Sequence, residues 1–142
     1  MAARRRGVEA RVLPVDHGRA ADDLRSHLAD LGPNVLLLTG HASDPVPRLE
    51  RVGRAGPLSP HGGPGLRRGR WPWADAHAEA RGRGLPLRAS FDAGRYVCDT
   101  TYWAALGTGV PLVAFLHLPA VGPVWTPHRA ARAVEAVLVA AL

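Results

Sequence analysis

The residue best suited to nucleophilic chemistry is Cys98, the one cysteine of the chain. It follows Ser90-Phe-Asp-Ala-Gly-Arg-Tyr-Val, a pattern that predicts a strand end, a glycine-containing turn and a helix with Cys98 in its first turn. Free backbone N–H groups at a helix start stabilise a thiolate and can bind an oxyanion formed on a substrate carbonyl. A free cysteine is also among the most buried residue types, so composition alone favours an inert residue.

His117 and Glu50 could complete such a site. His117 ends the apolar run Pro111-Leu-Val-Ala-Phe-Leu-His, where a neutral imidazole could take the thiol proton and later return it to a leaving amine. The alternative for His117 is a core histidine whose ring is satisfied by a backbone carbonyl. Glu50 could orient the base as a third group. Considered alone, Glu50 with Arg51 is more typical of a solvated charge pair.

Hydrophobic periodicity and chain breakers predict the elements that must position these residues. Apolar residues at helical spacing between an N-cap candidate, Asp16, and the stop Gly32-Pro33 predict an amphipathic helix. Further helices are predicted over residues 71–81, 96–106 and 126–142, the last with Thr126 as N-cap. Strands are predicted over residues 11–15, 35–39, 46–52, 85–90 and 110–118, and a long surface loop over residues 53–70.

Strands therefore alternate with helices along most of the chain. This order predicts an α/β fold, a three-layer sandwich with a mainly parallel central sheet flanked by helices. Working residues of such sheets gather at the carboxyl ends of the strands, which draws attention to Gly40, Ser90 and His117 by position alone. The length of 142 residues suits one domain over residues 1–142.

Three segments resemble the motifs of the pyroglutamyl peptidase I family of cysteine peptidases. Ser90-Phe-Asp-Ala-Gly-Arg-Tyr-Val-Cys98 is similar to its cysteine motif, and Phe115-Leu-His117-Leu-Pro119 is similar to its histidine motif. Leu38-Thr-Gly40 followed by Leu49-Glu50-Arg51-Val52 resembles its glutamate motif. The resemblance extends from about Val12 to the C-terminus. It implies a Cys98–His117–Glu50 triad that removes an N-terminal pyroglutamyl residue from peptides through a thioester, without metal or cofactor.

The chain also departs from the family pattern. Family members begin with a strand and a Phe-Glu-Pro-Phe-Gly-Gly type loop, whereas this chain begins near the family's second strand, so a shortened member is expected. Loss of that strand would expose a sheet edge, which could pair with a second copy in a homo-oligomer. Asp99 replaces the usual asparagine after the cysteine, and a carboxylate there would disfavour the thiolate. A catalytically silent or truncated relative is therefore the alternative to an active peptidase.

Composition restricts the partners. The formal net charge is +6, all 18 basic residues are arginine, and they are scattered apart from Arg4–Arg6 and the group Arg67, Arg68 and Arg70. Since no aromatic platform accompanies them, we expect no nucleic-acid partner, although a basic nucleic-acid-binding protein is a further alternative. No apolar run could cross a membrane. The histidines lack metal-ligand spacing, and a lone cysteine indicates a reducing, cytoplasmic location.

Overall fold

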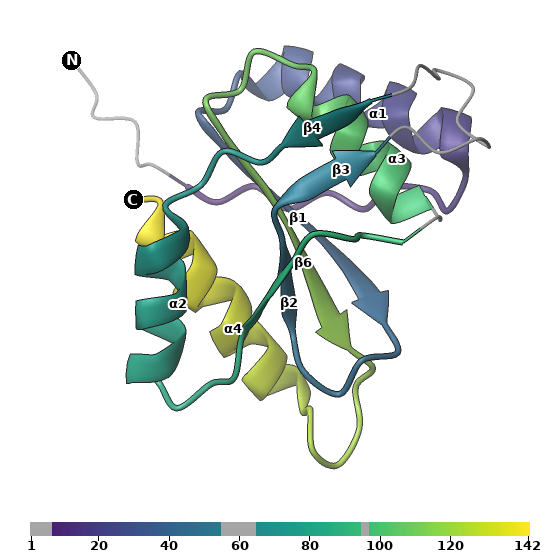
Figure 1. Cartoon of the computed structure of the whole chain (residues 1–142). Coiled ribbons are helices and arrows are strands. Elements are labelled where there is room, and N and C mark those ends of the chain that lie inside the picture. The colour runs from purple at the N-terminus through teal and green to yellow at the C-terminus, as the bar shows by residue number, and fades with distance from the viewer. Residues whose placement is uncertain (1–6, 55–64, 95–96) are drawn as a thin grey trace.

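The computed structural model describes residues 7–54, 65–94 and 97–142. Within these ranges the chain forms helices and strands that alternate along much of its length (Figure 1). In chain order they are α1 (His17–Leu31), β1 (Val35–Ala42), β2 (Arg48–Glu50), β3 (Val52–Arg54), β4 (Leu66–Arg68), α2 (Trp73–Gly82), β5 (Arg88–Ser90), α3 (Val97–Leu106), β6 (Leu112–Pro119) and α4 (Pro127–Ala140).

The main sheet of the described residues has the strand order β1–β6–β2–β5. β1 runs parallel to β6, and β2 runs parallel to β5, whereas β2 and β6 meet antiparallel at the centre. Two of the three pairings described in this main sheet are therefore parallel. The predicted α/β class and its mainly parallel sheet are confirmed.

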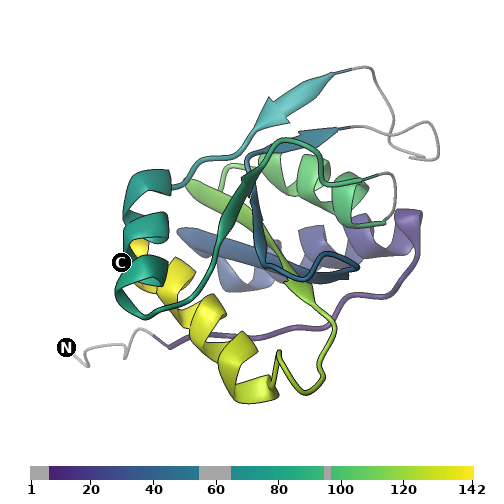
Figure 2. The ribbon, with the colours of Figure 1, turned by 60° about the horizontal axis from the view of Figure 1, so that its bottom comes forward.

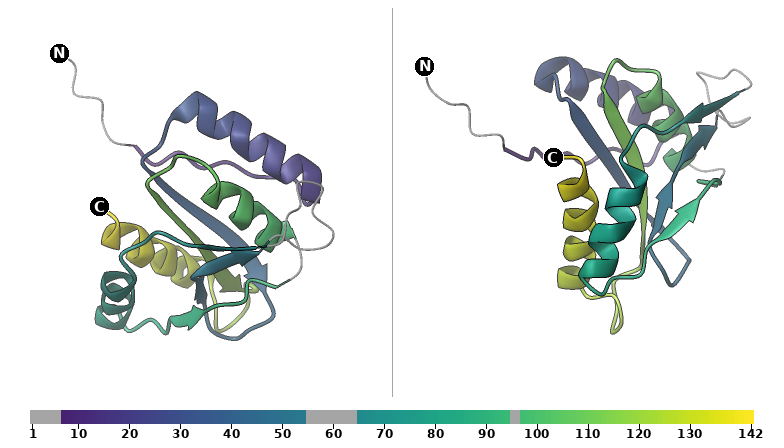
Figure 3. Two further views of the ribbon diagram at one scale, coloured as in Figure 1. Left: turned by 45° about the horizontal axis from the view of Figure 1, so that its top comes forward. Right: turned by 60° about the vertical axis from the view of Figure 1, so that its left-hand side comes forward.

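Helices cover both faces of this sheet. Figure 3 shows α1 and α3 on one side and α2 and α4 on the other, which confirms the three-layer arrangement. Alternate residues of β6 face the two layers: Val113 and Phe115 pack under α1 and α3, while Ala114 and Leu116 pack under α2 and α4. The side-chain period of two thus divides β6 between two hydrophobic clusters, one on each face of the sheet.

The helix boundaries follow the predicted capping signals. Asp16 accepts a hydrogen bond from the Arg19 N–H at the start of α1, and Gly32 ends that helix with a positive φ of 54°. Thr126 accepts a hydrogen bond from the Arg129 N–H at the start of α4. Trp71 is buried and donates its indole N–H to the Val137 carbonyl, so it fixes the entry to α2 against α4.

Two predictions about local structure are wrong. Residues 11–15 form no strand, and Val12 and Val15 are almost fully exposed; an apolar run becomes a strand only where a neighbouring strand supplies hydrogen bonds and cover. The predicted loop over residues 53–70 contains β4, which pairs antiparallel with β3 in a small ribbon against α3 (Figure 2). The part of that loop over residues 55–64 lies outside the described residues.

Candidate active site

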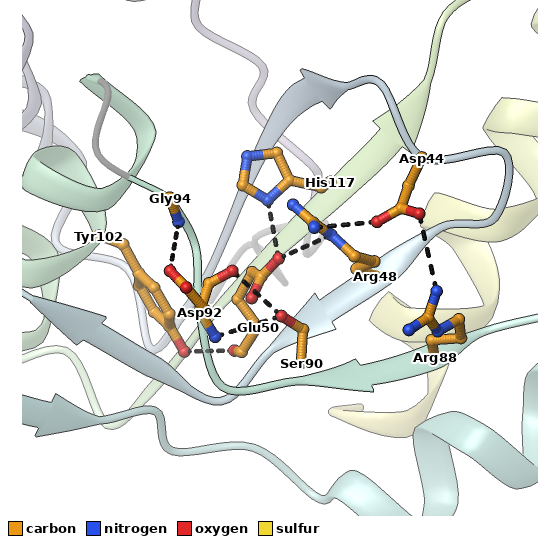
Figure 4. Close-up of polar contacts among 9 residues, drawn as sticks. All are labelled: Asp44, Arg48, Glu50, Arg88, Ser90, Asp92, Gly94, Tyr102 and His117. Carbon is orange, nitrogen blue, oxygen red and sulfur yellow. Dashed lines mark hydrogen bonds and ion pairs between the residues drawn. The ribbon is translucent and has the colours of Figure 1, made fainter.

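His117 and Glu50 form a buried hydrogen-bonded pair. Nδ1 of His117 lies 2.9 Å from Oε1 of Glu50, and both side chains are almost completely buried (Figure 4). The antiparallel ladder sets this contact, because it places Glu50 opposite Phe115 and Arg48 opposite His117, all on one face of the sheet. Glu50 is therefore not the solvated charge pair that its local sequence suggested.

Cys98 approaches the His117–Glu50 pair from α3, in the helix layer that covers this face of the sheet. It is the second residue of α3, as predicted, and is partly buried. Gly40 lies opposite His117 in the parallel ladder of β1 and β6, and a Cβ atom at position 40 would stand 2.8 Å from the Cys98 sulfur. The thiol thus rests on the backbone of β1 beside His117. The three residues predicted for the triad come together although they are far apart in the sequence.

The environment of His117 favours its protonated form. Burial, the largest influence, would lower its pKa, but hydrogen bonding and electrostatic interaction with Cys98 and Glu50 raise the pKa to about 9. At neutral pH the ring therefore carries a proton between a sulfur and a carboxylate. This is the arrangement in which an imidazolium can stabilise a thiolate and later act as an acid.

Arg48 contacts the same oxygen of Glu50 as His117, its cross-strand neighbour. Its guanidinium lies 2.9 Å from Asp44, and its Nε lies 3.3 Å from Oε1 of Glu50, an ion pair without hydrogen-bond alignment (Figure 4). The other oxygen of Glu50 is buried and has no hydrogen-bond partner among the described residues. The charges of Arg48 and protonated His117 thus offset the burial of this carboxylate. Sequence reasoning missed Arg48, whose two-residue spacing from Glu50 on a strand was the available signal.

Tyr102 connects the helix of Cys98 to the strand of Glu50. Its side chain is fully buried, and its hydroxyl donates to the backbone carbonyl of Glu50 at 2.7 Å. Burial and the Glu50 charge raise the pKa of Tyr102 well above its usual range, so the hydroxyl stays a donor. This hydrogen bond joins the layers that carry Cys98 and Glu50.

Replacement of Tyr102 by Phe is expected to lower the free energy of unfolding by about 1–3 kcal/mol, because a buried carbonyl loses its donor. Urea unfolding of the purified variant measures this change. Thr101→Val is a matched control on the same helix, since the Thr101 hydroxyl is buried without a partner among the described residues. This control should be neutral or stabilising, and a loss as large as that of Tyr102→Phe would contradict the role given to the tyrosine.

Asp99 does not point at the nucleophile as an unpaired charge. Its side chain is buried and Oδ1 accepts the backbone N–H of Arg54 at 2.8 Å, which holds β3 against α3. Burial, the largest influence, raises the pKa of Asp99, and the hydrogen bond and charge of Arg54 oppose the rise. The carboxylate that follows Cys98 is thus engaged by the chain itself.

Two arginines of the basic group, Arg67 and Arg70, serve the fold. Arg70 donates to three backbone carbonyls, those of Leu106, Val110 and Pro111. Arg67 donates to the Trp103 carbonyl and stacks on the Trp103 ring, 3.5 Å from its centroid. Part of the positive charge is therefore engaged in contacts within the protein.

Within the described parts of the chain, no three His, Cys, Asp or Glu side chains gather as ligands for a metal ion.

An α/β fold that brings a helix-start cysteine to a buried histidine–glutamate pair has the architecture of a cysteine hydrolase. No protein-family model matches the sequence. A pyrrolidone-carboxylate peptidase of Chromobacterium violaceum is 34% identical over 128 residues, which cover 79% of this chain and 61% of that protein. The chain thus spans about three fifths of the length of this curated relative.

Solved structures give the same result. The crystal structure of pyrrolidone carboxyl peptidase from Thermus thermophilus is 31% identical, with a TM-score of 0.75 over 90% of this chain and 80% of that one. The enzyme of Thermococcus litoralis, at 19% identity, shares the fold with a TM-score of 0.81 over 91% of this chain and 74% of that one. The chain belongs to the pyroglutamyl peptidase I, or pyrrolidone-carboxylate peptidase, family.

Proposed function

We propose that this protein is a cysteine peptidase that hydrolyses the bond after an N-terminal pyroglutamyl residue of peptides. The observation that carries the proposal is the buried Glu50–His117 hydrogen bond beside the sulfur of Cys98. A nucleophile, a base and a group that orients the base are the parts that acyl transfer requires. Membership of the family supports the choice of the pyroglutamyl group.

The mechanism has two halves. Cys98, as the thiolate paired with protonated His117, attacks the pyroglutamyl carbonyl carbon, and the C–N bond breaks as His117 gives its proton to the leaving amine. The resulting thioester is then attacked by water, whose proton returns to His117, and the sulfur leaves as a thiolate. Backbone N–H groups at the start of α3 have no partner within the helix and would bind the oxyanion in both halves.

Glu50 fixes the tautomer of the base. Its hydrogen bond with Nδ1 leaves Nε2 as the nitrogen that serves Cys98, the leaving amine and water in turn. Arg48 holds the carboxylate in place.

We also infer a cytoplasmic location, since a working thiol suits a reducing compartment. No helix of the described residues is long and apolar enough to span a membrane.

Hydrolysis of pyroglutamyl-7-amido-4-methylcoumarin by the purified protein tests the proposal. Fluorophore release from this amide is expected, with at least about hundredfold slower release from the prolyl amide, which lacks the lactam carbonyl. Circular dichroism establishes that the protein is folded. If folded protein releases no fluorophore from the pyroglutamyl amide, the activity is refuted and the chain is a catalytically silent member of the family.

A substitution at Gly40 tests whether Cys98 reacts from its observed position. Gly40→Ala places a methyl group 2.8 Å from the Cys98 sulfur and 3.0 Å from the Phe115 ring, so the thiol must move. Because displacements of about 1 Å at reacting atoms cost up to about a hundredfold, kcat/KM should fall by at least about tenfold. Gly82→Ala is the control, since a Cβ atom there meets nothing within 4 Å. Equal activity of the two variants would show that Cys98 does not work from this position.

A further inference from the structure

An open hollow of about 530 Å³ adjoins the candidate active site. It lies along β2 and β5, and its lining includes Arg48, Arg54, Arg88, Phe91 and Asp92. A second hollow, of about 450 Å³, lies at the far end of α1 and the turn before β6, away from the three site residues. Only the first of the two is close enough to receive part of a substrate held at Cys98.

Residues that line the first hollow are neighbours of each member of the candidate triad. Arg48 lies opposite His117 in the ladder of β2 and β6, and Ser90 lies opposite Glu50 in the ladder of β2 and β5. The backbone N–H of Arg54 is bonded to Asp99, the neighbour of Cys98 in sequence. A substrate whose scissile carbonyl lies at the sulfur would therefore extend one of its ends over these residues.

The three arginines that line the hollow differ in how completely nearby carboxylates neutralise them. Arg48 is paired with both Asp44 and Glu50, so its charge is already neutralised and is not free for a substrate. Arg88 has Asp44 as its partner at 3.6 Å, and its side chain is 63% exposed. Arg54 is exposed, and its guanidinium makes one long hydrogen bond, 3.4 Å, to the Phe91 carbonyl.

The acidic groups around the two exposed arginines are already engaged. Asp92 turns its carboxylate to the Gly94 N–H (Figure 4). The buried carboxylate of Asp99 accepts the Arg54 backbone N–H, and the Arg54 charge also acts on it. Asp44 divides its two oxygens between Arg48 and Arg88. Arg54 and Arg88 thus present N–H groups to the hollow that these carboxylates do not saturate.

We propose that Arg54 and Arg88 form a subsite for a carboxylate on the leaving part of the substrate, the part that follows the pyroglutamyl residue. The guanidinium fork is suited to a carboxylate, which it can bind through two parallel hydrogen bonds. The carboxylate has two sources, an acidic side chain at the second position of the peptide or the free C-terminus of a pyroglutamyl dipeptide. This inference rests on the peptidase function proposed above and names the substrates that it favours.

Two pairs of substrates distinguish the sources. Pyroglutamyl-glutamyl amide against pyroglutamyl-glutaminyl amide tests the side chain, and pyroglutamyl-alanine against pyroglutamyl-alanine amide tests the terminus. We expect the acidic member of at least one pair to show a kcat/KM about tenfold higher at low salt, and the ratio to decrease as salt screens the exposed arginines.

The double variant R54Q/R88Q should bring that ratio close to one. Arg25→Gln, which removes an exposed arginine at the second hollow, is the matched control and should keep the wild-type ratio. Thermal unfolding of both variants checks that they fold. The subsite is refuted if the wild type cleaves both members of each pair equally well, or if the preference survives in R54Q/R88Q. Failure to cleave any of the four substrates would instead refute the peptidase function, and the subsite with it.

Discussion

Cys98→Ser is expected to reduce hydrolysis of the pyroglutamyl amide by about four orders of magnitude or more, because members of a triad act as a unit. A serine hydroxyl is far harder to ionise than a thiol, so the charge-separated pair with His117 is lost. Release of coumarin under saturating enzyme measures the loss. The substitution removes little volume from a partly buried position, so the fold should be kept.

The chain offers an unusually direct check of this result. Since Cys98 is the one cysteine of the sequence, iodoacetamide can alkylate a single thiol, and mass spectrometry counts the adduct without ambiguity. Activity should decline in proportion to the fraction alkylated, while Cys98→Ser takes up no label. Fully alkylated protein that remains active, or a serine variant with near-wild-type kcat/KM, would exclude Cys98 as the nucleophile.

Glu50→Gln is expected to lower kcat/KM by about 10²–10⁴-fold and to move the alkaline limb of the pH profile to lower pH. In the wild type, burial lowers the pKa of His117, while Cys98 and Glu50 together raise it to about 9. His117 therefore keeps its proton up to about pH 9, and activity should fall above that value as the acid for the leaving amine is lost. Without the Glu50 charge, burial is less opposed, so the proton leaves at lower pH.

The measurement is kcat/KM from about pH 6 to about pH 10 for wild type and variant. Glu79→Gln serves as the control, because Glu79 lies on α2 in an ion pair with Arg83. Its profile should superimpose on that of the wild type. An unchanged alkaline limb in Glu50→Gln would mean that the carboxylate does not control the ionisation of His117, and that the pair is structural.

The sequence predicted the long elements and the positions of the short strands β2 and β5, but it missed β4 and placed a strand over residues 11–15 where none forms. The runs that became β1 and β6 are apolar enough to require cover on both faces, and Asp16, Gly32 and Thr126 give capping signals that act within a few residues. Residues 11–15 have an equally apolar pattern, yet no neighbouring strand pairs with them. Strands of three residues, such as β4, carry too little pattern to be separated from a loop.

The candidate site was partly predictable for a related reason. Cys98, His117 and Glu50 could be proposed from residue type, from position at a helix start or a strand end, and from the family resemblance. Tyr102 could not be proposed, and the two-residue spacing of Arg48 from Glu50 indicates only a shared strand face, because the contacts of both residues depend on which elements become neighbours and in which direction. The antiparallel meeting of β2 and β6 puts Arg48 opposite His117, and nothing in a strand of three residues encodes that direction.

The order of the strands has a consequence for the way the protein is made. β6 is the last strand along the chain, yet it lies between β1 and β2. A ribosome releases the chain from its N-terminus, so β1 and β2 emerge without the strand that joins them. The sheet and the His117–Glu50 contact, 67 residues apart, can form only after β6 has been synthesised and has left the ribosome. Until then the nascent chain presents apolar strands to its surroundings, so the site is assembled late relative to the strands that carry Glu50 and Gly40.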